Sequence, residues 1–246
     1  MVSVATQVQP LSERRFFTWM SAAMGAVTFA GFARTYYLAG FHDAPIPPLT
    51  PVIHLHGALA TAWILLLILQ TRLIANGRRD IHRRMGMAGL AVAAAVVVTG
   101  IFIALHSQRR VHTVETAGTV ADPYVFLIFP FVAIGLFAAF VALGIARRNR
   151  PDAHKRYMLL ATSNLIVPAL ARIVMQATHG AVVGVVGAVV LLNVFLIAML
   201  VHDFNTRGRL HPVTLWGGSV TVASEVLRFA IGYSEPWQSF ARMLMG

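Results

Sequence analysis

Residues 51–73 read PVIHLHGALATAWILLLILQTRL, and residues 181–201 read AVVGVVGAVVLLNVFLIAMLV. Each stretch is long enough to cross a bilayer as an α-helix, because about 20 apolar residues rising ~1.5 Å each span a hydrocarbon core of ~30 Å. Neither stretch alternates polar and apolar residues with a period of two, which argues against strands of a membrane barrel. The two stretches therefore predict an all-α membrane protein.

The same criterion, applied along the whole chain, predicts a seven-transmembrane-helix bundle that forms a single integral membrane domain over residues 1–246. The predicted helices cover residues 16–40, 52–74, 85–106, 123–146, 157–179, 181–202 and 212–233. The fifth and sixth helices meet at residues 179–180, which predicts a tight hairpin. The order of helices is then one leading helix followed by three helical hairpins.

The composition excludes several classes of protein. Of the 246 residues, 57% are hydrophobic and 12% are charged, and the mean hydropathy is +0.70. Soluble domains carry about 25% charged residues, so a soluble enzyme, a disordered chain and a collagen-like chain are all excluded. The chain has no cysteine, which excludes disulfides, thiolate nucleophiles and iron–sulfur clusters.

The distribution of charge predicts that the basic residues contact anionic lipid headgroups and not nucleic acid. The formal net charge is +11, and the basic residues lie in short loops between apolar segments. Of the 20 Lys and Arg, 14 fall on the side of the N-terminus and the even-numbered loops, and 3 (Arg109, Arg110 and Arg242) on the other side. The positive-inside rule places the N-terminus inside and the C-terminus outside. We expect a multi-pass protein of the bacterial inner membrane.

Two of the predicted inner loops share the pattern D-x-H-[KR]-R. It occurs at Asp80 with His82 and at Asp152 with His154, and His211 takes the equivalent position before the last helix. One interpretation is that the two aspartates cap helix N-termini while the basic residues meet lipid headgroups. The alternative is an inner cofactor or proton site that is formed by His82, His154, His202 and His211.

Four ionisable residues fall inside the predicted helices, where charge is costly and therefore a sign of function. Arg34, Arg172 and Arg228 lie at similar depths near the outer ends of three helices, and Glu225 precedes Arg228 by three residues, so the two can pair. One interpretation is that each guanidinium reaches the headgroups on its own. The other is a shared outer pocket that binds a carboxylate, a phosphate or the propionates of a haem.

Histidines add to the predicted outer pocket. His54 and His56 lie in the first turns of the helix at 52–74, and their two-residue spacing turns them to opposite faces. His106 ends the helix at 85–106 on the same side of the membrane. We predict His56 and His106 as candidate ligands of a haem iron, with His54 as a further cofactor-binding candidate.

Proline and asparagine residues inside the predicted helices have structural interpretations. Pro130 and Pro168 are expected to kink their helices, because proline lacks the N–H that the preceding turn needs. Asn164 and Asn193 lie near the middle of two predicted helices. We expect both amides to form hydrogen bonds between helices.

The helix starts HRRMG at residues 82–86 and HKRYM at residues 154–158 carry a resemblance to known proteins. In a small bundle with basic loops, they resemble a family of uncharacterised bacterial multi-span membrane proteins. More distantly, they resemble the transmembrane b-type cytochromes that move electrons between ascorbate or quinol and an acceptor. The second resemblance implies a haem b held by His82 with His154, or by His56 with His106.

Three functions remain open from the sequence, and none of them identifies a catalytic residue. The first is electron transfer with haem b or a quinone at the outer Arg/His pocket. The second is the binding or transport of a small anion or an acidic lipid by the same arginines. The third is that of a non-catalytic subunit, whose buried charges pair with another membrane protein.

Overall fold

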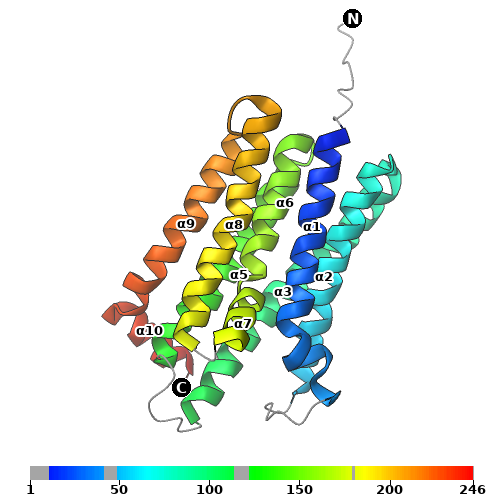
Figure 1. The fold of residues 1–246 in the computed structure, drawn as a ribbon. Helices are drawn as coiled ribbons and strands as arrows, with labels where there is room; N and C mark the ends of the chain where they lie inside the picture. The colour runs from blue at the N-terminus through cyan, green and yellow to red at the C-terminus, as the bar shows by residue number, and fades with distance from the viewer. Residues whose placement is uncertain (1–10, 42–48, 114–121, 179–180, 246) are drawn as a thin grey trace, which may run out of the picture.

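The computed structural model describes residues 11–41, 49–113, 122–178 and 181–245, and every regular element among them is helical. The elements are α1 (Leu11–Phe32), η1 (Ala33–Tyr37), η2 (Ala39–Phe41), α2 (Pro51–Ala75), α3 (Arg79–Thr113), α4 (Pro123–Phe126), α5 (Ile128–Ala146), α6 (Pro151–Leu165), α7 (Val167–Thr178), α8 (Ala181–Arg207), α9 (Pro212–Gly232) and α10 (Glu235–Met245). The long helices lie side by side in one bundle (Figure 1). The all-α class predicted from the sequence is confirmed.

Local sequence explains where the helices begin and end. Pro51, Pro151 and Pro212 occupy the first positions of α2, α6 and α9, where a missing N–H costs nothing and the fixed φ favours a helix. Gly77 and Gly208 follow α2 and α8 with φ of 75° and 65°, a left-handed conformation that glycine adopts without strain. These turns return the chain into the bundle at one end.

The predicted helix limits were too narrow at the basic loops. The helix predicted at 85–106 begins at Arg79, the one at 157–179 begins at Pro151, and the one at 181–202 continues to Arg207. Polar and charged residues extend these helices beyond their apolar segments, so hydropathy alone missed the added turns. The predicted hairpin at 179–180 lies outside the described residues, and α10 was not predicted.

Five helical stretches are long and apolar enough to cross a membrane, and the chain is accordingly a multi-pass membrane protein. They are Glu13–Tyr37, Pro51–Ala75, Arg79–Gln108, Pro123–Ala146 and Val186–Arg207. The pair α6 and α7 makes a sixth if it is counted as one broken span. The predicted seventh, α9, is a helix but falls short of this hydropathy, because Thr, Ser, Gly, Glu and Arg interrupt it.

Both predicted proline effects coincide with breaks in helices. α6 and α7 are separated at Ile166, two residues before Pro168, and their axes differ by 42°. α4 and α5 are separated at Leu127, three residues before Pro130. In each case proline cannot donate to the carbonyl one turn earlier, so the helix is interrupted there.

α6 is the central element of the bundle. It packs against α5, α9, α1, α8 and α7, and its buried side chains include Tyr157, Leu159 and Leu160 together with the polar Thr162, Ser163 and Asn164. The Trp63 indole on α2 donates to Thr162 at 3.1 Å. The core around α6 is therefore partly polar, unlike the apolar interior of most helical bundles.

The turns after α2, α5 and α8 lie with the start of α1 at one end of the bundle, which we call the basic end (Figure 1). α10 and η1 lie at the opposite end, which we call the far end. Most of the basic residues of the predicted inner loops flank the turns of the basic end. Charged and titratable side chains of α1, α6 and α8 therefore lie close together at the basic end.

Candidate functional sites

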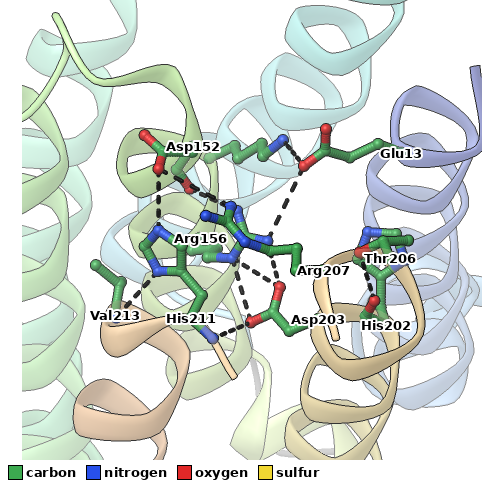
Figure 2. Close-up of polar contacts among 10 residues, drawn as sticks. Glu13, Asp152, Arg156, His202, Asp203, Thr206, Arg207, His211 and Val213 are labelled. Carbon is green, nitrogen blue, oxygen red and sulfur yellow. Dashed lines mark hydrogen bonds and ion pairs between the residues drawn. The ribbon is translucent and has the colours of Figure 1, made fainter. Parts of the chain in front are cut away.

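Charged side chains from α1, α6, α8 and the start of α9 meet inside the basic end, and we call this group the basic-end cluster (Figure 2). Its centre is Arg156 on α6, whose side chain is 1% exposed. Arg156 Nε donates to both carboxylate oxygens of Asp203 on α8, at 3.0 and 3.3 Å, and its Nη2 also contacts Asp203. The cluster consists of Glu13, Asp152, Lys155, Arg156, Asp203, Arg207 and His211.

The pair of Arg156 and Asp203 is tied to α1 by a second pair. Lys155 Nζ donates to Glu13, whose carboxylate also lies 4.0 Å from Arg156 Nη2. Lys155 and Arg156 lie over the ring of Phe17, at 4.5 and 5.6 Å from its centroid. Each buried charge thus has an opposite charge beside it, which is the condition for ions in a poorly solvated interior.

His211 links the cluster to the first turn of α9. Its Nδ1 accepts the backbone N–H of Val213 at 3.1 Å, so this nitrogen carries no proton and the ring caps the helix. Its Nε2 therefore carries the proton of the neutral ring and donates to Asp152 Oδ2 at 3.1 Å. Burial lowers the pKa of His211 more than the bond to Asp152 raises it, which favours this neutral form.

The predicted capping role of the two aspartates was wrong. The N-cap residue of α6 is Arg150, with no side-chain hydrogen bond at the cap, and Asp152 lies inside the first turn, where it binds His211 instead. Asp80 likewise lies within the first turn of α3, 3.8 Å from Arg78. Both helices start earlier than the hydropathy indicated, which moves the aspartates from the cap into the helix.

The four predicted inner histidines do not form one site, because His82 lies beside His154, His202 lies against α1, and His211 belongs to the basic-end cluster. The rings of His82 and His154 lie 6.2 Å apart at nearly a right angle, and His154 Nδ1 donates to the Gly144 carbonyl at 2.8 Å. His202 on α8 stacks on Phe16 of α1, with ring centroids 3.8 Å apart. Among the described side chains, His82 Nδ1 and His202 Nε2 are buried without a hydrogen-bond partner.

The three predicted pocket arginines occupy different parts of the far end. Arg172 on α7 stacks over Phe32 at 4.5 Å and donates to the Pro168 carbonyl at 3.1 Å. Arg34 lies two residues beyond Phe32, in η1, with an exposed side chain. Arg228 is buried on α9, which packs on α6, α5 and α8. No described contact joins Arg228 to the other two.

Glu225 and Arg228 are both buried on α9, but their predicted ion pair is not among the contacts within 4.0 Å of the described residues. Instead, Glu225 Oε2 accepts from Asn193 on α8 at 2.9 Å, and Arg228 Nη2 donates to Ser224 at 3.0 Å. Glu225 Oε1 and Arg228 Nε are buried without a described partner. We call Asn193, Ser224, Glu225 and Arg228 the Arg228 site.

The outer histidines are separated along the bundle. His56 Nδ1 contacts Thr99 on α3 at 2.9 Å, and since the Thr99 hydroxyl donates to Ala95, His56 is the donor of this bond. His54 is exposed, as its opposite face predicts. His106, whose buried Nε2 has no described partner, lies seven residues beyond Thr99, or about 10 Å along α3.

The sequence did not indicate the pairs formed by Arg156 with Asp203 and by Lys155 with Glu13. All four residues lie outside the helix limits predicted from hydropathy, and only the four-residue spacing of Asp152 and Arg156 indicated that side chains here share a helix face. The predicted roles of Asn164 and Asn193 are confirmed: Asn164 donates to Thr221 at 3.3 Å, and Asn193 to Glu225. Within the described part of the chain, no three His, Asp or Glu side chains form a group suited to a metal ion.

No protein-family model, curated protein or solved structure matches the chain.

Proposed function

We propose that the chain is a bacterial inner-membrane protein that binds and moves a small anion through the Arg228 site, with a proton carried by Glu225. In this proposal α9 is the seventh membrane span, the basic end is cytoplasmic and the far end is periplasmic. The excess of Lys and Arg near the basic end supports this orientation. The main support for the proposal is the buried environment of Arg228, and the second is the apolar outward face of α9.

The two faces of α9 support its place in the membrane. Its outward face carries large exposed apolar side chains, among them Leu215, Trp216, Val222, Val226 and Phe229. Its 21 residues span about 31 Å, which matches the hydrocarbon core of a bilayer. A helix with apolar residues outside and polar residues inside suits a span that borders a polar path.

Polar residues follow the inward face of α9 from one end to the other. Spacings of three, seven, four and three residues separate these positions, which keeps them on one side of a helix. All five side chains are buried: His211, Thr214, Thr221, Glu225 and Arg228. This stripe faces Asn164 on α6 and Asn193 on α8, so each of these two helices makes a hydrogen bond to the polar face of α9.

Arg228 is the single observation that carries the proposal. Its side chain is 1% exposed, yet its described hydrogen bond goes to a neutral hydroxyl, and its Nε has no described partner. An ion buried in this way is stable when a counter-ion completes its environment. A guanidinium favours carboxylate and phosphate groups because it can hold them with two parallel hydrogen bonds.

Glu225 supplies the second half of the proposed mechanism. It lies one turn from Arg228 and has one carboxylate oxygen bonded to Asn193 and one without a described partner. A protonated Glu225 leaves the positive charge of Arg228 free to attract an anion, whereas an ionised Glu225 offsets that charge. Binding of the anion and uptake of a proton by Glu225 would therefore favour each other.

The test measures anion binding to the purified full-length chain in nanodiscs. The probes are chloride, acetate, succinate and inorganic phosphate, and the readouts are calorimetry and the shift in Tm. We expect saturable binding of at least one probe, weakened at least tenfold in Arg228→Gln. Glu225→Gln should bind well but lose the dependence of affinity on pH.

The matched control is Arg172→Gln, which removes a far-end arginine that stacks on Phe32 and lies apart from α9. It should leave anion binding within about twofold of the parent. Equal binding by Arg228→Gln and the parent, or no binding of any probe, would contradict the proposed function.

We propose electron transfer with haem b or a quinone as the second candidate, because of the histidine pair at the basic end. His154 donates from Nδ1 to a carbonyl, so its Nε2 has a free lone pair directed by a fixed ring, as iron-ligating histidines have. His82 lies 6.2 Å away with an unpartnered Nδ1. His82 and His154 would hold the haem iron, and the haem would supply one-electron chemistry.

An absorption spectrum and a pyridine haemochrome assay of the detergent-purified chain test this second candidate. A Soret band that is lost in both His82→Ala and His154→Ala supports it. Retention of that band in both variants, or a haem-free protein from haem-replete cells, contradicts it.

A further inference from the structure

A groove at the basic end lies between the start of α1 and the end of α2. It has a volume of about 310 Å³ and is lined by Arg14, Arg15, Thr18, Trp19 and Ala75. Liquid water occupies about 30 Å³ per molecule, so the groove is large enough for a group of several heavy atoms. Neither the Arg228 site nor the basic-end cluster includes these lining residues.

The groove carries positive charge without a carboxylate to offset it. Glu13, the neighbouring acid, pairs with Lys155 and lies 4.0 Å from Arg156 Nη2, so its carboxylate is directed to α6 (Figure 2). Among the described ion pairs, neither Arg14 nor Arg15 has an acidic partner within 4.0 Å.

The hydrogen bonds of the two arginines leave most of their donors available. Arg14 donates one N–H to the Ala75 carbonyl at 3.5 Å, at the C-terminus of α2, where a cation is favourable. Arg15 is exposed and forms no hydrogen bond among the described residues. Each guanidinium has five N–H donors, so the pair can still bind the oxygens of an anion.

Trp19 gives the groove an apolar wall on the side of the bilayer. It lies one helical turn below Arg15, and its side chain is 73% exposed. An indole at this position, next to basic residues and at the end of an apolar helix, is typical of the headgroup level of a membrane. The groove thus changes from cationic to aromatic over one turn of α1.

We infer that this groove binds an anionic phospholipid, with the lipid phosphate held by Arg14 and Arg15 and the glycerol and upper acyl chains against Trp19. A phosphodiester matches the donors of two guanidiniums, and the aromatic wall matches the apolar part of the same molecule. In the orientation proposed above, the basic end faces the leaflet in which anionic lipids act on juxtamembrane arginines. This inference does not depend on the Arg228 site.

Native mass spectrometry of the full-length chain tests the lipid site. Protein purified in a neutral detergent is titrated with phosphatidylglycerol or with phosphatidylcholine of the same acyl chains. We expect phosphatidylglycerol to be retained at least fivefold better than phosphatidylcholine. Arg14→Gln/Arg15→Gln should abolish that preference.

The matched control is Arg147→Gln/Arg148→Gln, which removes the same charge from exposed residues at the same end but outside the groove. It should retain the preference for phosphatidylglycerol. Equal retention by the groove variant and this control would overturn the inference. Inorganic phosphate that displaces the lipid at equal concentration would also overturn it, because the acyl chains would then add nothing.

Single substitutions test the lipid site in case Arg14→Gln/Arg15→Gln does not fold. Arg15 has no described hydrogen bond, so Arg15→Gln should leave the Tm in detergent unchanged and still reduce lipid retention at least twofold. Trp19→Ala should weaken phosphatidylglycerol and leave the weak binding of inorganic phosphate unaltered. Unchanged lipid retention in both of these folded variants would count against the site.

Discussion

His211 donates from Nε2 to Asp152 at 3.1 Å while its Nδ1 caps α9, so a single neutral imidazole joins the first turns of two helices. A second proton on this ring would have to sit on Nδ1, where it would face the N–H of Val213. The structure therefore selects one tautomer and one charge state for His211.

We predict that acidification destabilises the protein through His211. Burial lowers the pKa of His211 in the folded state below the ordinary value of about 6.5. A lowered pKa stabilises the fold above the unfolded value, and this contribution is lost as the pH falls through the folded value. The Tm should fall between pH 7 and pH 5, and it should fall less in His211→Asn, whose amide can still cap α9.

The exposed His54 provides the control for this measurement. His54→Asn should show the same fall in Tm on acidification as the parent. If His211→Asn and the parent lose the same number of degrees, the neutral ring does not have the stabilising role we assign to it.

Arg156→Met should be strongly destabilising. It leaves the Asp203 carboxylate, which is 1% exposed, without its main counter-ion, and removal of one partner from a buried pair costs about 3–5 kcal/mol. Unfolding in a mixed detergent system measures the change. Arg156→Met/Asp203→Asn should recover part of the loss, because the amide is neutral and still accepts from the His211 backbone N–H. A double variant less stable than Arg156→Met would contradict this account.

Gly31→Ala should separate α1 from α7. A Cβ at Gly31 would collide with the Ala169 backbone, which cannot move as a side-chain end can. Overpacking of this kind costs about 1–3 kcal/mol, which thermal unfolding will register as a lower Tm. Gly135→Ala is the matched control, since nothing lies within 4 Å of a Cβ there, and its Tm should equal or exceed that of the parent.

Asn193→Leu should destabilise the contact between α8 and α9. The Glu225 carboxylate would lose the donor that lies 2.9 Å away, and a buried acceptor left without a partner costs about 1–3 kcal/mol. Asn193→Leu/Glu225→Leu should be more stable than Asn193→Leu, because both polar groups are then replaced. The free energies of unfolding of the two variants test this, and a double variant less stable than Asn193→Leu would contradict this account.

The helices that could be predicted are those with apolar residues on every face, because both the lipid and the protein interior favour apolar side chains. α5 is apolar throughout and α2 has a long apolar middle, so hydropathy located both to within a few residues. α9 was predicted with the same criterion as the other helices, but its inward face is polar, which lowers its hydropathy below that of the five candidate spans. Hydropathy reports the average of a helix, whereas a polar site alters one face.

The sites were less predictable because they depend on which helices are neighbours. The sequence predicted similar depths for Arg34, Arg172 and Arg228, but it could not show that α9 packs on α6 and α8 while Arg172 packs on α1. Asp203 and Arg156 are 47 residues apart and meet through the packing of α6 and α8. The local repeat around Asp152 identified the region of the cluster without identifying its partners.

The 42° break at Ile166 gives α6 and α7 different neighbours. α6 packs mainly on α5 and α9, whereas α7 packs mainly on α8 and α1. The break thus divides the packing of this segment between two sets of partners, and the ionic contacts of Arg156 belong to the α6 half alone.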